Sequence, residues 1–277
     1  MTLTHLRHPA TASAQGGPLR VAVLGHGSIG RPVADALKSG NVDGAALAAV
    51  VDSHGTQDAA GESITFAQAT ELADLFVEAA GQNVLAEFGP RVVAAGVDLL
   101  VLSIGALADE RLHEQLFGGP GRLYLSTGAI GGLDLIRAVA DGGTLDKICI
   151  ETYKQPRTLV QDWMDDQQRA ELLEVTGRTE VLRGTPQRIA TAFPKSANVA
   201  MAVAMAAGDP AKVEAVVFAD PECSLTSNEI TVQSRTGSYL FQIRNLPSRD
   251  NPASSGVVPF AVLRAIQDLA GRRETLI

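Results

Sequence analysis

The sequence has little of what marks secreted, metal-rich or membrane-spanning proteins. Its 277 residues include only two cysteines, Cys149 and Cys223. These are too few for a disulfide framework or a cysteine-rich metal site, and such scarcity is typical of the reducing cytoplasm. The longest apolar stretches, such as 97–108 and 197–208, are shorter than the roughly 20 residues that cross a bilayer. We therefore expect a cytoplasmic protein with no membrane association and no bound metal.

Aromatic residues and basic charge are also scarce. The chain has 8 Phe, 3 Tyr and 1 Trp, so its 45% apolar content must pack a core mainly from Ala, Val, Leu and Ile. That composition favours α/β layering over an aromatic-rich β-sandwich. The 31 acidic and 23 basic side chains give a formal net charge of −8. Nucleic acid is excluded as a partner, because its binding depends on neutralising phosphates with clustered Lys and Arg.

Segments of alternating type organise the first half of the chain. Residues 1–18 lack an apolar signal region and are expected to be a flexible lead-in. After them, apolar runs typical of strands occur at 19–24, 45–51, 73–79, 98–103 and 122–126, and helical patterns occur from 31 onward and at 83–95, 108–116 and 133–140. Strands that alternate with helices predict a doubly wound parallel sheet, because parallel strands need crossover connections.

The pattern changes after about residue 145. Residues 147–153, 214–219, 229–234 and 238–244 predict strands, the last three of antiparallel type with one solvated face. Helices are expected at 197–207 and 257–269. The predicted fold is α/β, with an N-terminal Rossmann domain at 19–130, completed by the C-terminal helix within about 252–277. A C-terminal α+β substrate and dimerisation domain is expected at 131–251.

A glycine turn follows the first predicted strand and opens the first predicted helix. Gly25, Gly27 and Gly30, with Ser28 and Ile29 between them, form GxGxxG. The glycines permit a tight turn, close approach to a pyrophosphate and close helix packing, and the helix N-terminus favours phosphate. Asp52 closes the second strand, where a carboxylate binds the adenine ribose and repels a 2′-phosphate. We therefore predict NAD as the cofactor, with NADP as the alternative.

Several longer motifs resemble the L-aspartate dehydrogenase family. The most specific is STGAIGGLD at 126–134. Others are VEAAGQ at 77–82, SIGAL at 103–107, FPKSANVA at 193–200, Asp-Pro at 220–221 and NPASS at 251–255. The resemblance covers about 19–269. It implies a homodimer and reversible oxidative deamination of aspartate to iminoaspartate, which is hydrolysed to oxaloacetate and ammonia or feeds NAD biosynthesis in some bacteria.

The resemblance also implies positions for the site. The strand-end segments carrying Ala80, Ser103, Gly105, Ser126, Gly128 and Ala129 are expected to line the nicotinamide side of the cofactor. The small-molecule substrate would be bound by Lys154, Ser196 and Asn198. Lys195 is a candidate proton carrier, because a partly buried ammonium can lower its pKa, and Lys154 is the weaker candidate for the same role.

Two positions depart from the family pattern. Asn228 stands where the family has its catalytic histidine, and an amide cannot take up a proton near neutral pH. All five histidines of the chain precede residue 114, so none lies nearby in the sequence. Arg188 stands where the family has a carboxylate. If Arg188 faces the pocket it changes substrate choice, and if it faces solvent it changes nothing.

Three hypotheses follow. In the first, the protein is an aspartate dehydrogenase in which Asn228 orients the substrate and another group carries the proton. In the second, it is an NAD(P)-dependent dehydrogenase or imine or carbonyl reductase with a different substrate. In the third, it is a non-catalytic NAD-binding protein.

Overall fold

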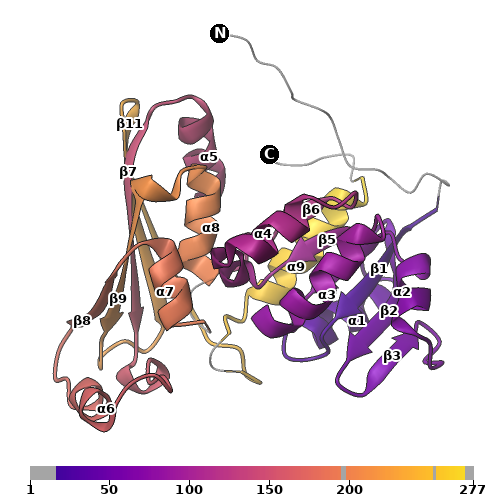
Figure 1. The fold of residues 1–277 in the computed structure, drawn as a ribbon, viewed down its shortest axis with the longest axis horizontal. Coiled ribbons are helices and arrows are strands. Elements are labelled where there is room, and N and C mark those ends of the chain that lie inside the picture. Colours follow the sequence, from indigo (N-terminus) through magenta and orange to yellow (C-terminus); the bar gives the residue numbers. More distant parts are fainter. Residues whose placement is uncertain (1–16, 195–197, 252–253, 272–277) are drawn as a thin grey trace.

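The computed structural model describes residues 17–194, 198–251 and 254–271. It contains two β-sheets with helices packed around them (Figure 1). The first sheet has six strands in the order β3-β2-β1-β4-β5-β6. Its strands are β1 (Leu19–Leu24), β2 (Ala45–Asp52), β3 (Gly55–Asp58), β4 (Leu75–Glu78), β5 (Asp98–Val101) and β6 (Leu123–Leu125). All neighbouring pairs are parallel except β2 and β3, which are antiparallel.

Helices cover both faces of this sheet because its strands are apolar on both sides. The helices are α1 (Gly30–Lys38), α2 (Phe66–Leu72), α3 (Gln82–Ala94), α4 (Glu110–Phe117) and α9 (Val258–Leu269). On one face, α1 and α9 pack against β1, β4 and β5 through Val33, Leu37, Val262 and Ile266. On the other face, α2, α3 and α4 enclose Phe76, which is fully buried. The predicted doubly wound Rossmann arrangement is confirmed.

The second sheet has five strands in the order β11-β10-β7-β9-β8. These are β7 (Leu145–Lys154), β8 (Thr179–Gly184), β9 (Val213–Ala219), β10 (Thr226–Ser234) and β11 (Gly237–Asn245). Apart from the parallel pair β7 and β9, all neighbours are antiparallel. Residues 214–219 were expected to form an antiparallel strand. This is confirmed for the pairing of β9 with β8 and wrong for its pairing with β7, which is parallel. The chain between β7 and β9 passes through helices, so that β9 runs in the same direction as β7, as in crossover connections.

Three helices lie on the side of the second sheet that faces the first (Figure 1). They are α5 (Leu133–Asp141), α7 (Pro186–Ala192) and α8 (Asn198–Ala207), and a further helix, α6 (Asp166–Leu173), lies at one end. Short 3-10 turns occur at η1 (Ile104–Ala108), η2 (Pro156–Thr158) and η3 (Pro210–Lys212). Residues 146–154 of β7 alternate, so that Ile148, Ile150 and Thr152 point to the helix-covered face, which we call the inner face.

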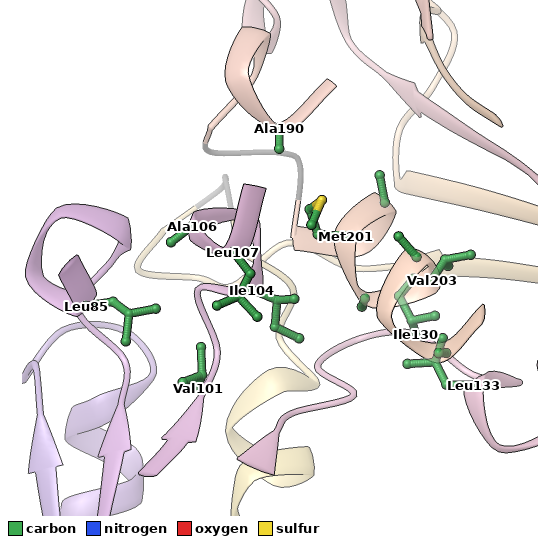
Figure 2. Close-up of a cluster of buried hydrophobic side chains, with 14 of the residues drawn as sticks. Leu85, Val101, Ile104, Ala106, Leu107, Ile130, Leu133, Ala190, Met201 and Val203 are labelled. Carbon is green, nitrogen blue, oxygen red and sulfur yellow. The ribbon is translucent and has the colours of Figure 1, made fainter. Parts of the chain in front are cut away.

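The two parts share a continuous apolar core at η1. Figure 2 shows Ile104 and Leu107 of η1 lying between Leu85 of α3 and Met201 of α8, with Ile130 close by. All five side chains are buried. This contact places the carboxyl ends of β5 and β6 beside the start of α8.

Some elements were not anticipated from the sequence. The stretch after Asp52 forms β3 and α2, and residues 179–192 form β8 and α7. The helix expected at 108–116 begins at Glu110, because Asp109 caps it by accepting hydrogen bonds from the amides of Arg111 and Leu112.

Candidate active site

The glycine turn lies where the strand order of the first sheet reverses, between β1 and β4. Crevices at such switch points are where open α/β sheets bind their ligands. Gly25 has a φ of +101°, and a Cβ there would lie 2.7 Å from Cβ of Ala80, the residue that follows β4 by two positions. A Cβ at Gly30 would lie 1.8 Å from the carbonyl oxygen of Gly25. Both glycines are therefore required by close packing of the chain itself.

The middle glycine has a different environment. A Cβ at Gly27 would meet no atom within 4 Å, so Gly27 borders open space at the start of α1. The N-cap residue of α1, Ile29, provides no side-chain cap. The amide of Arg31 donates to the carbonyl of Gly27 at 3.0 Å, and Pro32 has no amide hydrogen. The positive end of the helix dipole therefore faces this space, which fits a pyrophosphate.

Asp52 lies at the end of β2, beside this turn. Its Oδ1 accepts a hydrogen bond from the amide of His54 at 2.7 Å, and the Nδ1 of His54 lies 3.5 Å from the same oxygen. The Nδ1 of His26, which belongs to the glycine turn, lies 4.0 Å from Oδ2. The structure thus brings the glycine turn and the predicted ribose carboxylate together, with one imidazole on each side of the carboxylate.

The remaining predicted cofactor residues follow β5 and β6. Ser103 is buried, and the amide of Gly105 donates to Oδ1 of Asn198 at 2.9 Å. Ser126 is buried, and its hydroxyl accepts from the amide of Gly128 at 3.1 Å. Ala129 accepts through its carbonyl from Nδ2 of Asn245 on β11. These residues occupy the same carboxyl edge of the sheet as Gly25 and Ala80, and two of them contact the second part of the chain directly.

A polar group lies on the inner face of the second sheet, at the carboxyl end of β7. Asn228 is 2% exposed, and its Oδ1 accepts a hydrogen bond from the hydroxyl of Thr152 at 2.9 Å. Lys154 is the next residue along the same face of β7 and is 9% exposed. Burial lowers the pKa of Lys154 to about 8, because a low-dielectric environment disfavours the charged ammonium. A titratable amine therefore lies on the same face as the untitratable amide.

The structure places the other predicted substrate residues differently. Asn198 begins α8 and, through Gly105, contacts the first part of the chain. Arg188 is exposed on α7, and its Nη1 donates to the carbonyl of Arg183 on β8, at the edge of the sheet. Two strands separate β8 from Asn228, so Arg188 does not join this group. Lys195 and Ser196 lie outside the described residues.

One cavity, of about 300 Å³, lies away from this group. Tyr153, Ser227 and Glu229 contribute to its lining, and these residues alternate with Lys154 and Asn228 along β7 and β10. The cavity is therefore on the opposite face of the second sheet.

Comparison with known proteins decides the family. Residues 134–269 match the family model "Aspartate dehydrogenase, C-terminal", and residues 25–119 match "Homoserine dehydrogenase, NAD binding domain". The L-aspartate dehydrogenase of Ruegeria pomeroyi is 35% identical over 91% of this chain and 93% of its own length. The chain belongs to the aspartate dehydrogenase family. The L-aspartate dehydrogenase of Nitrosopumilus maritimus is 32% identical over 90% of this chain and 95% of its own length.

Solved structures show the same fold for this family member. The crystal structure of aspartate dehydrogenase from Thermotoga maritima matches with a TM-score of 0.71 and 24% identity, covering 94% of this chain and 99% of that one. A putative homoserine dehydrogenase from Archaeoglobus fulgidus matches with a TM-score of 0.55 and 11% identity, covering 91% and 99%. The predicted resemblance and fold class are confirmed.

The described residues contain no group of three His, Cys, Asp or Glu side chains arranged to hold a metal ion. Within the same residues, no helix is long and apolar enough to cross a membrane.

Two polar residues of the site were not anticipated. Thr152 fixes the orientation of Asn228, and Glu78, at the end of β4, is fully buried and hydrogen-bonded to the loops after β4 and β5. The signal for Glu78 was present in the sequence as an acidic residue that closes an otherwise apolar strand, the same pattern as Asp52 on β2.

Proposed function

We propose that this protein is an NAD(P)-dependent oxidoreductase that interconverts L-aspartate with iminoaspartate, and so with oxaloacetate and ammonia. The observation that carries this proposal is the 35% identity to an L-aspartate dehydrogenase over 91% of the chain. When bound, the nicotinamide exchanges a hydride with the α-carbon of the substrate. We assign cofactor binding to residues 19–130 with the C-terminal helix, and substrate binding to 131–251.

The described residues divide the work of binding and orientation. The turn at Gly27 and the start of α1 would receive the pyrophosphate, and Asp52 would accept hydrogen bonds from the adenine ribose. Asn228 would orient the substrate through its amide group, because its carbonyl oxygen is already bonded to Thr152. Asn198 would hold the loop at Gly105 against the substrate side.

Lys154 is our candidate for the group that carries the proton in place of the missing histidine. It lies on the same face as Asn228, and its pKa of about 8 lets it exchange a proton near neutral pH. In the deamination direction the neutral amine is the base, so we expect kcat to rise as pH increases through about 8. The role of Lys195 as a proton carrier stays a prediction.

Asn228 also favours a second candidate function, a related NAD(P)-dependent reductase or dehydrogenase with another amine, imine or carbonyl substrate. A buried amide that is bonded to Thr152 binds polar groups without exchanging protons. A substrate whose chemistry needs no proton transfer at this position fits such a residue.

The direct test is an assay of NADH consumption with oxaloacetate and ammonia. Consumption supports the aspartate reaction. If the protein binds NADH without consuming it, a panel of other 2-oxo acids, aldehydes and amines follows. Turnover of any member of the panel supports the second candidate, and binding without turnover of any supports a non-catalytic NAD-binding protein.

Asp52 gives a prediction about cofactor choice. Hydrogen bonds to charged groups are worth roughly 1.5–3 kcal/mol, so Asp52→Ala should raise the Kd for NADH about 10- to 100-fold. The Kd for NADPH should fall or stay unchanged, because repulsion of the 2′-phosphate is also removed. Titration of both cofactors measures this. Asp43→Ala removes an exposed carboxylate before the opposite end of β2 and should change neither Kd. Equal weakening of NADH and NADPH by Asp52→Ala would rule out the ribose role.

Lys154 gives a prediction about stability. The folded pKa of about 8 lies below the unfolded value near 10.5. Below pH 8 both states hold the proton, and burying the charge costs roughly 3 kcal/mol at 1.36 kcal/mol per pKa unit. Between pH 8 and 10.5 the folded state releases its proton first, so this cost disappears as pH rises. Lys154→Met should therefore stabilise the protein at pH 7 by up to about 3 kcal/mol and hardly at pH 10.5.

Urea unfolding at the two pH values measures the difference between wild type and Lys154→Met. Lys147→Met removes an exposed lysine from the opposite face of β7 and serves as the control, with little change expected at either pH. Lys154→Met should also lose the rise of kcat near pH 8, and Lys147→Met should keep it. A stability difference that is the same at both pH values contradicts the assigned burial cost.

We further propose a homodimer, as the family resemblance implies. The face of the second sheet opposite the inner face carries Leu240, which is 63% exposed on β11, and such apolar exposure is typical of association surfaces. Light scattering should give the mass of two chains. The two cysteines, both free, support a reducing compartment such as the cytoplasm.

A further inference from the structure

A single buried carboxylate joins the loops after β4 and β5. Glu78, the last residue of β4, is 0% exposed. Charged side chains are almost never buried to this extent unless they are paired or fully hydrogen-bonded. The partners of this carboxylate therefore show what it does.

Five hydrogen bonds converge on Glu78. Oε1 accepts from the amides of Ala80 at 2.9 Å and Gly81 at 2.8 Å, and from the hydroxyl of Ser103 at 2.9 Å. Oε2 accepts from the amides of Leu102 at 3.2 Å and Ser103 at 2.9 Å. One oxygen thus closes the loop after β4, the other closes the loop after β5, and the Ser103 hydroxyl links the two.

Each of these loops continues directly to a contact with the second part of the chain. After Gly81, Nε2 of Gln82 donates to the carbonyl of Pro194 at 2.9 Å. After Ser103, the amide of Gly105 donates to Asn198. The two contacts are adjacent, because a Cβ at Gly105 would lie 2.4 Å from Nε2 of Gln82. The positions of both contacts depend on the loops that Glu78 holds.

The location of these loops relative to the cofactor follows from the sheet order. Asp52 on β2 marks the adenosine side, and the pyrophosphate turn follows β1. A dinucleotide that continues across the switch point brings its other half over the carboxyl ends of β4 and β5. These are the ends that Glu78 connects.

An amide cannot replace this carboxylate. A carboxylate has only acceptor sites, whereas a glutamine side chain presents two N–H donors in place of one oxygen. In Glu78→Gln one set of donors, either on the β4 loop or on the β5 loop, would face another donor. The two loops can then no longer be held in the same arrangement.

We propose that Glu78 is a positioning residue that holds the β4 and β5 loops in the arrangement that binds the nicotinamide half of the cofactor and docks Pro194 and Asn198. This inference rests on the proposed function. It goes further by assigning recognition of one half of the dinucleotide to a residue that does not touch it. Stability alone does not explain a glutamate here, because an apolar side chain of similar volume generally stabilises a buried position at least as much as a charge does.

The test compares binding of NADH with binding of ADP-ribose, which lacks the nicotinamide. Glu78→Gln should raise the Kd for NADH at least about tenfold, as expected for loss of a hydrogen bond to a charged group. The Kd for ADP-ribose should change less than about threefold, because Asp52 and the glycine turn are untouched. Ser103→Ala removes one donor of the five and should give the same selectivity with a smaller loss.

The matched control is Leu75→Ala, which opens a cavity in the same strand at the end away from the cofactor; Leu75 is 1% exposed. It should lower the Tm and leave both dissociation constants within about twofold of wild type, since its effect is confined to packing. If Glu78→Gln does not fold, Ser103→Ala carries the comparison.

If the wild type binds both NADH and ADP-ribose, either of two results overturns the proposal. One is a Glu78→Gln or Ser103→Ala protein with a lowered Tm and an unchanged Kd for NADH. The other is equal weakening of NADH and ADP-ribose. A wild-type protein that binds neither probe contradicts the proposed function itself, and this inference with it.

Discussion

Asn228→His is expected to raise kcat/KM for aspartate by about 100-fold, the lower end of what a positioned general acid or base contributes. Asn228 is buried on the inner face beside Thr152 and on the same face as Lys154. An imidazole there can bond to the Thr152 hydroxyl through one nitrogen and exchange a proton through the other. The gain should appear in kcat, because the variant adds a proton carrier and leaves the cofactor site unchanged.

Steady-state kinetics of aspartate oxidation measures this gain. Thr231→His places the same side chain on the opposite face of β10, three residues along, and should have no effect on activity. A folded Asn228→His protein that binds NADH and shows no gain contradicts the proposal that Asn228 contacts the substrate. A gain for another amine and not for aspartate supports the second candidate function.

The second large effect is expected at two glycines of the same turn, with opposite consequences. Gly30→Ala places a Cβ 1.8 Å from the Gly25 carbonyl oxygen, a backbone atom that cannot move aside, so unfolding free energy should fall by about 3 kcal/mol or more. Gly27→Ala meets no protein atom within 4 Å, so stability should stay within about 0.5 kcal/mol. It should still raise the Kd for NADH at least about tenfold, because its methyl group enters the space for the pyrophosphate.

Urea unfolding and NADH titration of both variants separate these effects. Gly177→Ala is the control, because a Cβ there also meets nothing within 4 Å and the position lies far along the chain from the turn. Both measured quantities should stay at the wild-type values in this control. If Gly27→Ala binds NADH as tightly as wild type, the cofactor does not approach the chain at this turn.

The glycine turn and its position beside Asp52 could be predicted because their signal is local. GxGxxG after a strand, with Asp52 at the end of the next strand, encodes a backbone geometry and a charge within a short stretch of chain. The structure places Gly25, Gly30 and Asp52 where that motif requires them. The alternation of strands and helices likewise predicted the first sheet.

Glu78 escaped prediction because its role depends on distant residues. Ser103 lies 25 positions away, so an acidic residue at the end of an apolar strand marks the position without showing which groups it binds. The orientation of Arg188 was open for a similar reason, since helix α7 itself was not anticipated. The structure shows that its guanidinium bonds to the Arg183 carbonyl and is exposed.

The second sheet shows a limit of another kind. Alternation along 214–219 indicates a strand, but the direction of its neighbours depends on the path of the chain between β7 and β9. Pairing directions follow from connections as well as from side chains. For this reason β9 pairs parallel with one neighbour and antiparallel with the other.

The central claim is that the chain interconverts aspartate with oxaloacetate and ammonia. It is tested most directly by supplying NADH, oxaloacetate and ¹⁵N-ammonium and identifying the product by NMR. The account predicts ¹⁵N-labelled L-aspartate in equal amount to the NADH consumed, with less formed by Lys154→Met. NADH consumption that yields malate or any other product without ¹⁵N, or NADH binding without consumption, would contradict it.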